Sequence, residues 1–193
     1  NPAANTWDLE SLPALEAVVN NLNGMAEVRA LVITGQGAKF FSAGADLNQF
    51  ADGDPIAAGA MGEAFGAAFE TLADYRGVSI AAINGYAMGG GLEVALACDI
   101  RIAESHAALA LPEAKVGLLP CAGGTQRLAQ LVGEGWAKRI MLCGERVSAE
   151  KAMTLGLVEE VVASGTSLAA AIDLAKRASD QSPTSIAACK RLI

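Results

Sequence analysis

The chain has 193 residues, 52% of them hydrophobic and 18% charged, which is enough to bury a core and excludes an intrinsically disordered protein. Its formal charge of −7 disfavours a nucleic-acid surface, because phosphate binding needs a basic footprint. The longest stretch without a charged residue contains Asn84 and several glycines, so we expect no membrane span.

The first half of the chain alternates helical and strand patterns. Residues 8–23 have a helical periodicity, and residues 28–34 form a short β-branched run typical of a buried strand. A glycine-rich loop follows, and then a helix is expected over 56–74. Residues 78–84 predict a second buried strand, which the loop GYAMGGG separates from a helical pattern over 92–99.

The second half begins with residues 101–111, which indicate two short strands around a turn. One or two helices are expected over 123–142, with a break near Gly133–Gly135. The remaining expected elements are a helix over 149–154 capped by Ser148, a strand over 157–162 and two closing helices, the last capped by Ser182. Strands that alternate with helices predict a single α/β domain with parallel strands and a helical C-terminal part.

The cysteines are widely spaced and form neither a CxxC pair nor a zinc-ligand pattern, so no metal site is expected. We expect no secretory signal, because no basic segment followed by an apolar run is visible at the start of the sequence. Scattered thiols without such a signal indicate a reducing compartment, and we expect a cytoplasmic protein. The cysteines are Cys98, Cys121, Cys143 and Cys189.

Small residues follow the C-terminal ends of the strands 28–34 and 78–84, where open α/β sheets bind ligands. Small residues let a ligand approach the backbone closely, and two N–H groups from separate loops could form an oxyanion hole. Each loop alone is equally compatible with an ordinary turn, and neither matches a dinucleotide or P-loop motif. The residues are Ala43, Gly44 and Ala45 in the first loop and Gly89, Gly90 and Gly91 in the second.

Two glutamates lie close to these features. Glu93 is in the first turn of the helix after the second loop, and Glu113 follows Pro112 at the end of an apolar strand. Each alone is more typical of a solvated residue that offsets a helix dipole. If both face one cavity, they can hold a water molecule and share its proton transfers. The sequence by itself leaves their proximity open.

Four segments together resemble the crotonase (enoyl-CoA hydratase/isomerase) superfamily along essentially the whole chain. They are FFSAGADL at 40–47, IAAINGYAMGGGLEVALACDIRIA at 80–103, PEAKVGLLPCAGGTQRL at 112–128 and GERVSAEKAMTLGLVEEVV at 144–162. The resemblance implies an α/β spiral of repeated ββα units with a helical C-terminal part. It also implies one crotonase-like domain over 1–193 without the family's N-terminal strands and final helical segment, and a homotrimer or a dimer of trimers.

The resemblance also implies a site. It assigns the oxyanion-hole amides to Ala45 and Gly90 and the catalytic carboxyls to Glu93 and Glu113. The implied substrate-binding residues are Ala43, Gly44, Ala45, Asp46, Leu47, Gly89 and Gly90. CoA would be part of the substrate, with no separate cofactor and no metal, and the family's spread suggests a bacterial protein.

Because it has both glutamates, the chain resembles an enoyl-CoA hydratase. Such an enzyme adds water syn to a trans-2-enoyl-CoA in fatty acid or related acyl-CoA degradation. Two positions depart from the family pattern: Cys121 stands where glycine is usual, and Asn48 where a basic residue is frequent. The acyl pocket is expected to involve the segment around 50–70.

Three alternatives remain open from the sequence. A double-bond isomerase or another crotonase-type acyl-CoA enzyme would use the same oxyanion hole with a single glutamate, and a non-catalytic acyl-CoA-binding protein would keep only the fold. A serine peptidase is disfavoured, since no GxSxG motif is present and the one histidine, His106, lies in a polar turn where we expect it to be solvated.

Overall fold

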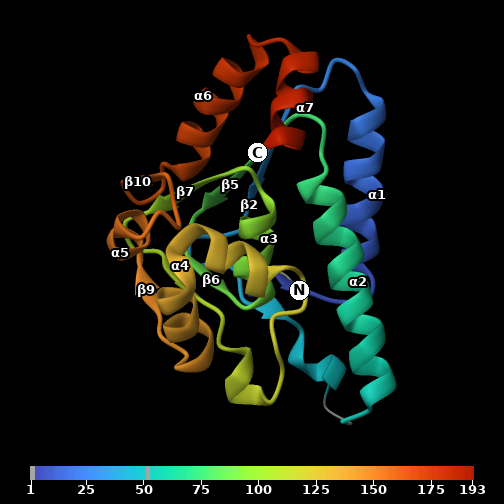
Figure 1. Ribbon diagram of the computed structural model, residues 1–193, viewed down its shortest axis with the longest axis vertical. Helices are drawn as coiled ribbons and strands as arrows, with labels where there is room; N and C mark the ends of the chain where they lie inside the picture. The colour runs from blue at the N-terminus through green and yellow to red at the C-terminus, as the bar shows by residue number, and fades with distance from the viewer. Residues whose placement is uncertain (1–2, 51–52) are drawn as a thin grey trace.

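Two four-stranded sheets form the centre of the molecule in the computed structural model, which describes residues 3–50 and 53–193 (Figure 1). The first sheet has the order β10-β7-β5-β2 and is parallel throughout. Its central strands β5 and β7 are almost entirely buried, as expected for a parallel sheet covered on both faces. The strands are β2 Ala30–Thr34, β5 Val78–Ile83, β7 Ile100–Glu104 and β10 Glu160–Val162.

The second sheet has the order β3-β6-β8-β9 and is parallel except for β9, which runs antiparallel to β8. Its strands are β3 Phe40–Ser42, β6 Tyr86–Met88, β8 Ala108–Ala110 and β9 Val147–Ser148. A further parallel pair joins β1 Thr6–Trp7 to β4 Gly44–Ala45. Three times along the chain, a strand of the first sheet is followed by a strand of the second sheet before the next helix begins. These strand pairs are β2 and β3, β5 and β6, and β7 and β8. The predicted α/β class with parallel strands is confirmed.

The helices cover these sheets unequally. Helices α1 and α2 lie side by side along one flank, whereas α3 is in the centre and all its residues are buried (Figure 1). Within the part of the chain that the structure describes, no helix is both long and apolar enough to cross a membrane. The helices are α1 Ser11–Gly24, α2 Pro55–Ala73, α3 Gly90–Ala97, α4 Gly124–Leu142, α5 Ala149–Thr154, α6 Ser167–Ser179 and α7 Pro183–Leu192, with 3-10 helices η1 Leu47–Phe50 and η2 Glu113–Val116.

Several predicted boundaries are confirmed by their backbone geometry. Gly133 has φ 76° and ψ 160°, which breaks α4 within the predicted range. The side chain of Ser148 accepts a hydrogen bond from the amide of Lys151, and that of Ser182 accepts one from the amide of Ser185. Both serines are therefore the N-caps that the sequence predicts.

Strands β3, β6 and β9 of the second sheet were the main omission from the sequence, whereas β8 lies within the predicted strand pair over 101–111. The loop GYAMGGG contains β6, and FFS forms β3, although neither pattern predicts a strand. Strands of two or three residues are too short to display the period of two by which strands are recognised. The strand expected over 157–162 is also shorter, since β10 contains only its last three residues.

Candidate active site

A cavity of about 760 Å³ lies where the two small-residue loops meet α2 and η2. Most residues that the sequence assigns to a site line it: Ala43, Gly44, Ala45, Leu47, Gly89, Gly90, Glu93 and Glu113. Asp46 is the exception. Its carboxylate does not line the cavity and instead accepts hydrogen bonds from the backbone amide and the Nδ2 of Asn48, at 3.1 and 2.8 Å.

Two backbone amides belong to cavity-lining residues and are candidate donors to a ligand. Gly90 is the first residue of α3, so its amide has no acceptor within the helix and lies at the positive end of the dipole. Directly after β4, the amide of Asp46 donates to the carbonyl of Trp7 at 2.8 Å. Because successive amides of a strand point to opposite edges, the amide of Ala45 points away from β1.

The two loops touch through their main chains at Gly44. This residue has φ +92°, and a Cβ placed on it would lie 2.7 Å from the carbonyl oxygen of Met88 and 3.1 Å from the amide nitrogen of Gly90. Only glycine satisfies both the backbone conformation and the close approach. The glycine therefore fixes the relative position of the two loops that carry the candidate amides.

Glu93 is buried, with 2% of its surface exposed. Its Oε1 accepts hydrogen bonds from the amides of Ala122 and Gly124 at 2.8 and 2.9 Å, so the N-terminal end of α4 holds the carboxyl in one orientation. Burial raises the pKa of Glu93, although these two hydrogen bonds and the charge of Arg127 act in the opposite direction.

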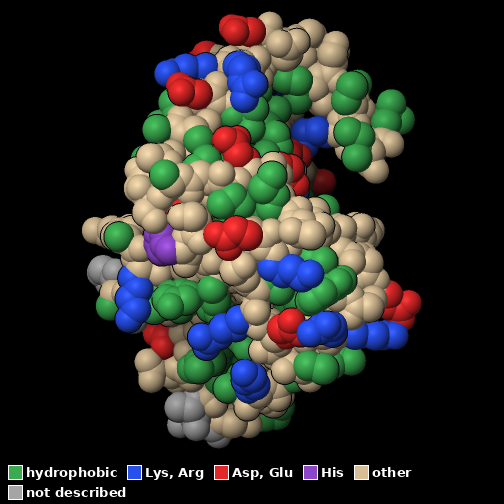
Figure 2. Space-filling model, turned by 90° about the vertical axis from the view of Figure 1, so that its left-hand side faces the viewer, with side chains coloured by type: hydrophobic (Ala, Val, Ile, Leu, Met, Phe, Trp, Pro, Cys, Tyr) green, Lys and Arg blue, Asp and Glu red, His purple; other side chains and the backbone are tan. Residues whose placement is uncertain are grey.

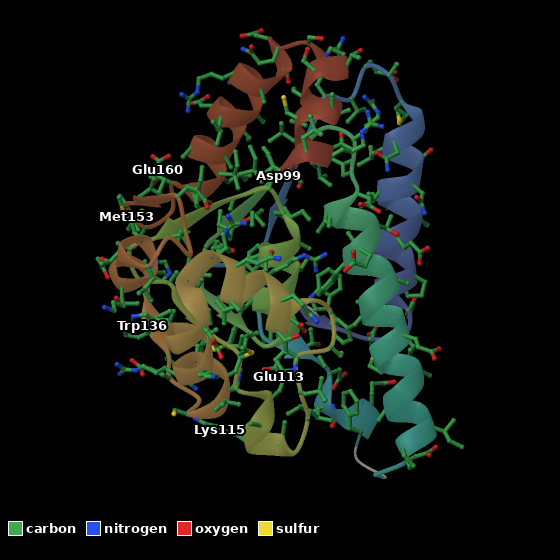
Figure 3. All side chains as sticks on the ribbon, in the orientation of Figure 1. Asp99, Glu113, Lys115, Trp136, Met153 and Glu160 are labelled. Atoms are coloured by element: carbon green, nitrogen blue, oxygen red, sulfur yellow. The ribbon has the colours of Figure 1, made fainter. Side chains whose placement is uncertain are left out.

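In the view of Figure 3, Glu113 lies between α4 and α2, and the residue is half-buried. Both of its carboxyl oxygens are buried, and neither has a hydrogen-bond partner within residues 3–50 and 53–193. Burial raises the pKa of Glu113 to about 7, and the charge of Glu93 adds to the rise. Its Oε1 would lie 3.1 Å from a Cβ placed on Gly89, beside the first turn of α3. Near neutral pH this carboxyl can therefore either donate or accept a proton.

Further residues line the cavity, and some of them lie on α2 within the segment around 50–70 that the sequence expected at the acyl pocket. Helix α2 contributes a face of mostly small residues, and Lys115 and Arg146 add positive charge. Figure 2 shows Lys and Arg gathered on the lower part of the face that carries α5 and β9, despite the chain's formal charge of −7. No sequence motif marks these side chains. The α2 residues are Ala58, Gly59, Met61, Gly62 and Phe65.

Cys121 also lines the cavity, and the cysteines all carry free thiols. Burial raises the pKa of the Cys121 thiol to about 11, and the charges of Glu93 and Glu113 raise it further. The thiol is therefore protonated near neutral pH and lies close to both carboxyls.

His106 is not merely solvated, as the sequence suggested. Its Nδ1 lies 2.9 Å from the Oγ of Ser164 and its Nε2 lies 3.2 Å from the carbonyl oxygen of Ala38. The Oε2 of Glu104 is 3.7 Å from the same Nδ1. A catalytic triad needs the serine and the acid on different ring nitrogens, so this cluster does not have a peptidase's geometry, and it lies outside the cavity.

The fold and the cavity define an α/β protein whose site combines two carboxyls with backbone amides from two strand-end loops. Residues 1–193 match the family model described as enoyl-CoA hydratase/isomerase, and the chain belongs to this family, the crotonase family. Membership implies that its substrates are acyl-CoA thioesters.

Comparisons with individual proteins agree with this membership. The chain is 35% identical over 191 residues to a short-chain-enoyl-CoA hydratase of Clostridium acetobutylicum, covering 99% of this chain and 73% of that enzyme. It is 38% identical over 191 residues to a carnitinyl-CoA dehydratase of Salmonella typhi, with the same coverage. Among solved structures, Pseudomonas aeruginosa DspI is 64% identical with a TM-score of 0.98, covering 100% of this chain and 79% of that one.

Proposed function

We propose that the chain is an enoyl-CoA hydratase, which adds water syn to a trans-2-enoyl-CoA and gives a 3-hydroxyacyl-CoA. The observation that carries this proposal is that two carboxyls with different hydrogen bonding, Glu93 and Glu113, line the same cavity as the amides of Ala45 and Gly90. One of the relatives is named as a short-chain hydratase, which supports the same reaction.

In this proposal the thioester oxygen accepts hydrogen bonds from the amides of Ala45 and Gly90. Negative charge develops on that oxygen as water attacks Cβ, and the two donors with the dipole of α3 stabilise it. Removal of one such donor typically costs about 10²–10³ in rate. The acyl group is thereby held with its double bond facing the carboxyls.

The carboxyls then divide the proton transfers. The two amides at Glu93 favour its ionised form, so this carboxylate takes a proton from the water as its oxygen bonds to Cβ. Glu113, whose pKa is about 7, gives its proton to Cα. Glu93 is then protonated and Glu113 ionised, and proton exchange through the next water restores both.

The direct test is to incubate the purified chain with crotonyl-CoA in ¹⁸O-labelled water and to analyse the product by mass spectrometry. We expect 3-hydroxybutanoyl-CoA with the label in its hydroxyl group. Binding of crotonyl-CoA without turnover would contradict the proposal and would favour an acyl-CoA-binding protein.

A second candidate is double-bond isomerisation, for which one carboxyl that shuttles a proton between Cα and Cγ is sufficient. It is favoured by Glu113, whose carboxyl has no hydrogen-bond partner in the part of the chain that the structure describes. A 3-enoyl-CoA separates the two activities. Its conversion to the conjugated 2-enoyl-CoA, together with no loss of absorbance on crotonyl-CoA, would assign the chain as an isomerase.

A further inference from the structure

Two cations on the cavity wall have no partner among the described residues. Lys115 is in η2 and Arg146 directly precedes β9, and both line the cavity. Neither side chain makes an ion pair or a hydrogen bond within the part of the chain that the structure describes. The carboxylate next to Arg146 in the sequence is that of Glu145, and it pairs with Arg139 instead, at 2.7 Å.

The two cations come from segments that lie against each other. A Cβ placed on Gly144 would lie 2.6 Å from the Cε and 3.2 Å from the Nζ of Lys115. The end of the lysine side chain therefore rests on the main chain of Gly144, and Arg146 follows Gly144 in the same loop. Lys115 and Arg146 form one positively charged region of the cavity wall, hereafter the basic rim.

The candidate catalytic carboxyls do not neutralise the basic rim. The charge that acts on the pKa of Glu113 is that of Glu93, and the cation that acts on the pKa of Glu93 is Arg127. The basic rim thus presents uncompensated positive charge to the cavity. Charge of one sign in a concave site attracts ligands of the opposite sign. Such a rim is typical of a binding site for an anionic group.

The basic rim is close to the reacting part of the proposed substrate. Lys115 and Glu113 share η2, and a 3-10 helix rises about 2.0 Å per residue, so the two residues begin about 4 Å apart along its axis. Figure 3 shows Lys115 below Glu113, toward the lower end of the molecule. In a CoA thioester the whole pantetheine arm separates the double bond from the nearest phosphate. A phosphate would therefore reach Lys115 only if this arm folded back over the site, whereas an anion on the acyl group would not need to fold.

We propose that the basic rim binds a carboxylate at the far end of the acyl group, so that the substrates include short dicarboxylic acyl-CoA thioesters. The inference rests on the proposed function only in that it places the double bond beside Glu113. A guanidinium binds a carboxylate through two parallel hydrogen bonds, and an ammonium adds a point charge. A terminal carboxylate should therefore raise affinity about tenfold over a terminal methyl group, because hydrogen bonds between charged groups are stronger than neutral ones.

Calorimetry with glutaryl-CoA and pentanoyl-CoA tests this proposal, because the two acyl groups have the same number of carbons and differ only in the terminal carboxylate or methyl. Neither acyl group has a double bond, so a failure of the hydratase assignment would not affect the result. We expect the wild type to bind glutaryl-CoA about tenfold more tightly. In Lys115→Met and in Arg146→Gln, glutaryl-CoA should bind at least about fivefold more weakly, while pentanoyl-CoA should change by less than about twofold.

Lys151→Met is the matched control. Lys151 is a cation of α5 whose Nζ lies 4.4 Å from the centroid of the Trp136 ring, and it does not line the cavity. Its affinities for both thioesters should equal those of the wild type, and circular dichroism should show the same fold in all three variants. Equal losses for both thioesters in the rim variants would mean that the rim binds the CoA part, and would overturn the proposal. No loss in either rim variant, or equal affinities of the wild type for the two thioesters, would also overturn it.

Discussion

Glu93 and Glu113 face the same cavity, but the first carboxyl accepts two backbone hydrogen bonds and the second accepts none from the described residues. Carboxyls in such different surroundings favour different protonation states. The proposed hydration depends on this difference, since it needs one group that accepts a proton and another that supplies one.

Replacement of Glu113 by Gln should remove the proton donor to Cα and lower kcat for crotonyl-CoA by about 10²–10⁴-fold. The fold should be intact, because the carboxyl makes no hydrogen bond with the described residues that the change would break. Loss of substrate absorbance measures the rate. Glu160→Gln is the control, since Glu160 lies at the outer edge of the molecule far from Glu113 (Figure 3), and near-normal turnover in Glu113→Gln would refute the assignment.

Replacement of Glu93 by Gln should also lower kcat by about 10²–10⁴-fold, because an amide cannot take the proton of the attacking water. The amide oxygen can still accept the hydrogen bonds from Ala122 and Gly124, so the circular dichroism spectrum should match that of the wild type. If Glu93 only positions the N-terminal end of α4, the variant will keep most of its turnover.

The pH dependence of kcat/KM should reflect the raised pKa of Glu113. Its protonated form predominates below about pH 7 and is lost above it. We therefore expect kcat/KM for crotonyl-CoA to fall as the pH rises through 7, with the midpoint at the pKa of this carboxyl. A rate that stays constant from pH 6 to pH 9 would contradict the role of Glu113 as the proton donor.

The same carboxyl should make stability depend on pH. A folded-state pKa of about 7, above the ordinary 4.5, means that the folded chain binds more protons between these values, so stability falls as the pH rises through that window. The Glu113→Gln variant has no carboxyl at this position, so its stability does not fall with pH for this reason. Relative to the wild type it should gain about 1–3 kcal/mol between pH 5 and pH 8, measured by urea denaturation, and a difference that is independent of pH would count against the shift.

Substitution of Gly44 by Ala should disturb both loops, because its Cβ would approach the carbonyl of Met88 to 2.7 Å at a positive φ. We expect a loss of about 1–3 kcal/mol in stability and at least about tenfold in kcat, as the amides of Ala45 and Gly90 move apart. Gly135→Ala is the matched control, since it has open space and no positive φ. Equal behaviour of the two variants would show that the close approach is unimportant.

The buried strand 78–84 and the capped helices were predictable from the sequence, because long apolar runs and N-cap residues act locally. Of the second sheet only β8 was predicted, since Tyr86–Met88 is short and its pairing with β3 and β8 depends on distant segments. The sequence nominated Glu93 and Glu113, but only the fold places them on one cavity. Residues of the segment 50–70, which the sequence expected at the acyl pocket, line the cavity from α2, whereas no pattern singled out Lys115 or Arg146.

The contact between Gly44 and the Gly89–Gly90 turn joins main chain to main chain, so the separation of the candidate oxyanion donors does not depend on the side chains that form the cavity walls. The walls on α2 and at Cys121 belong to other segments. Residues that select the acyl group can therefore vary without altering the main-chain contact that positions the candidate oxyanion donors. Such a division would allow related chains to acquire new substrates by a few wall substitutions while keeping the same chemistry.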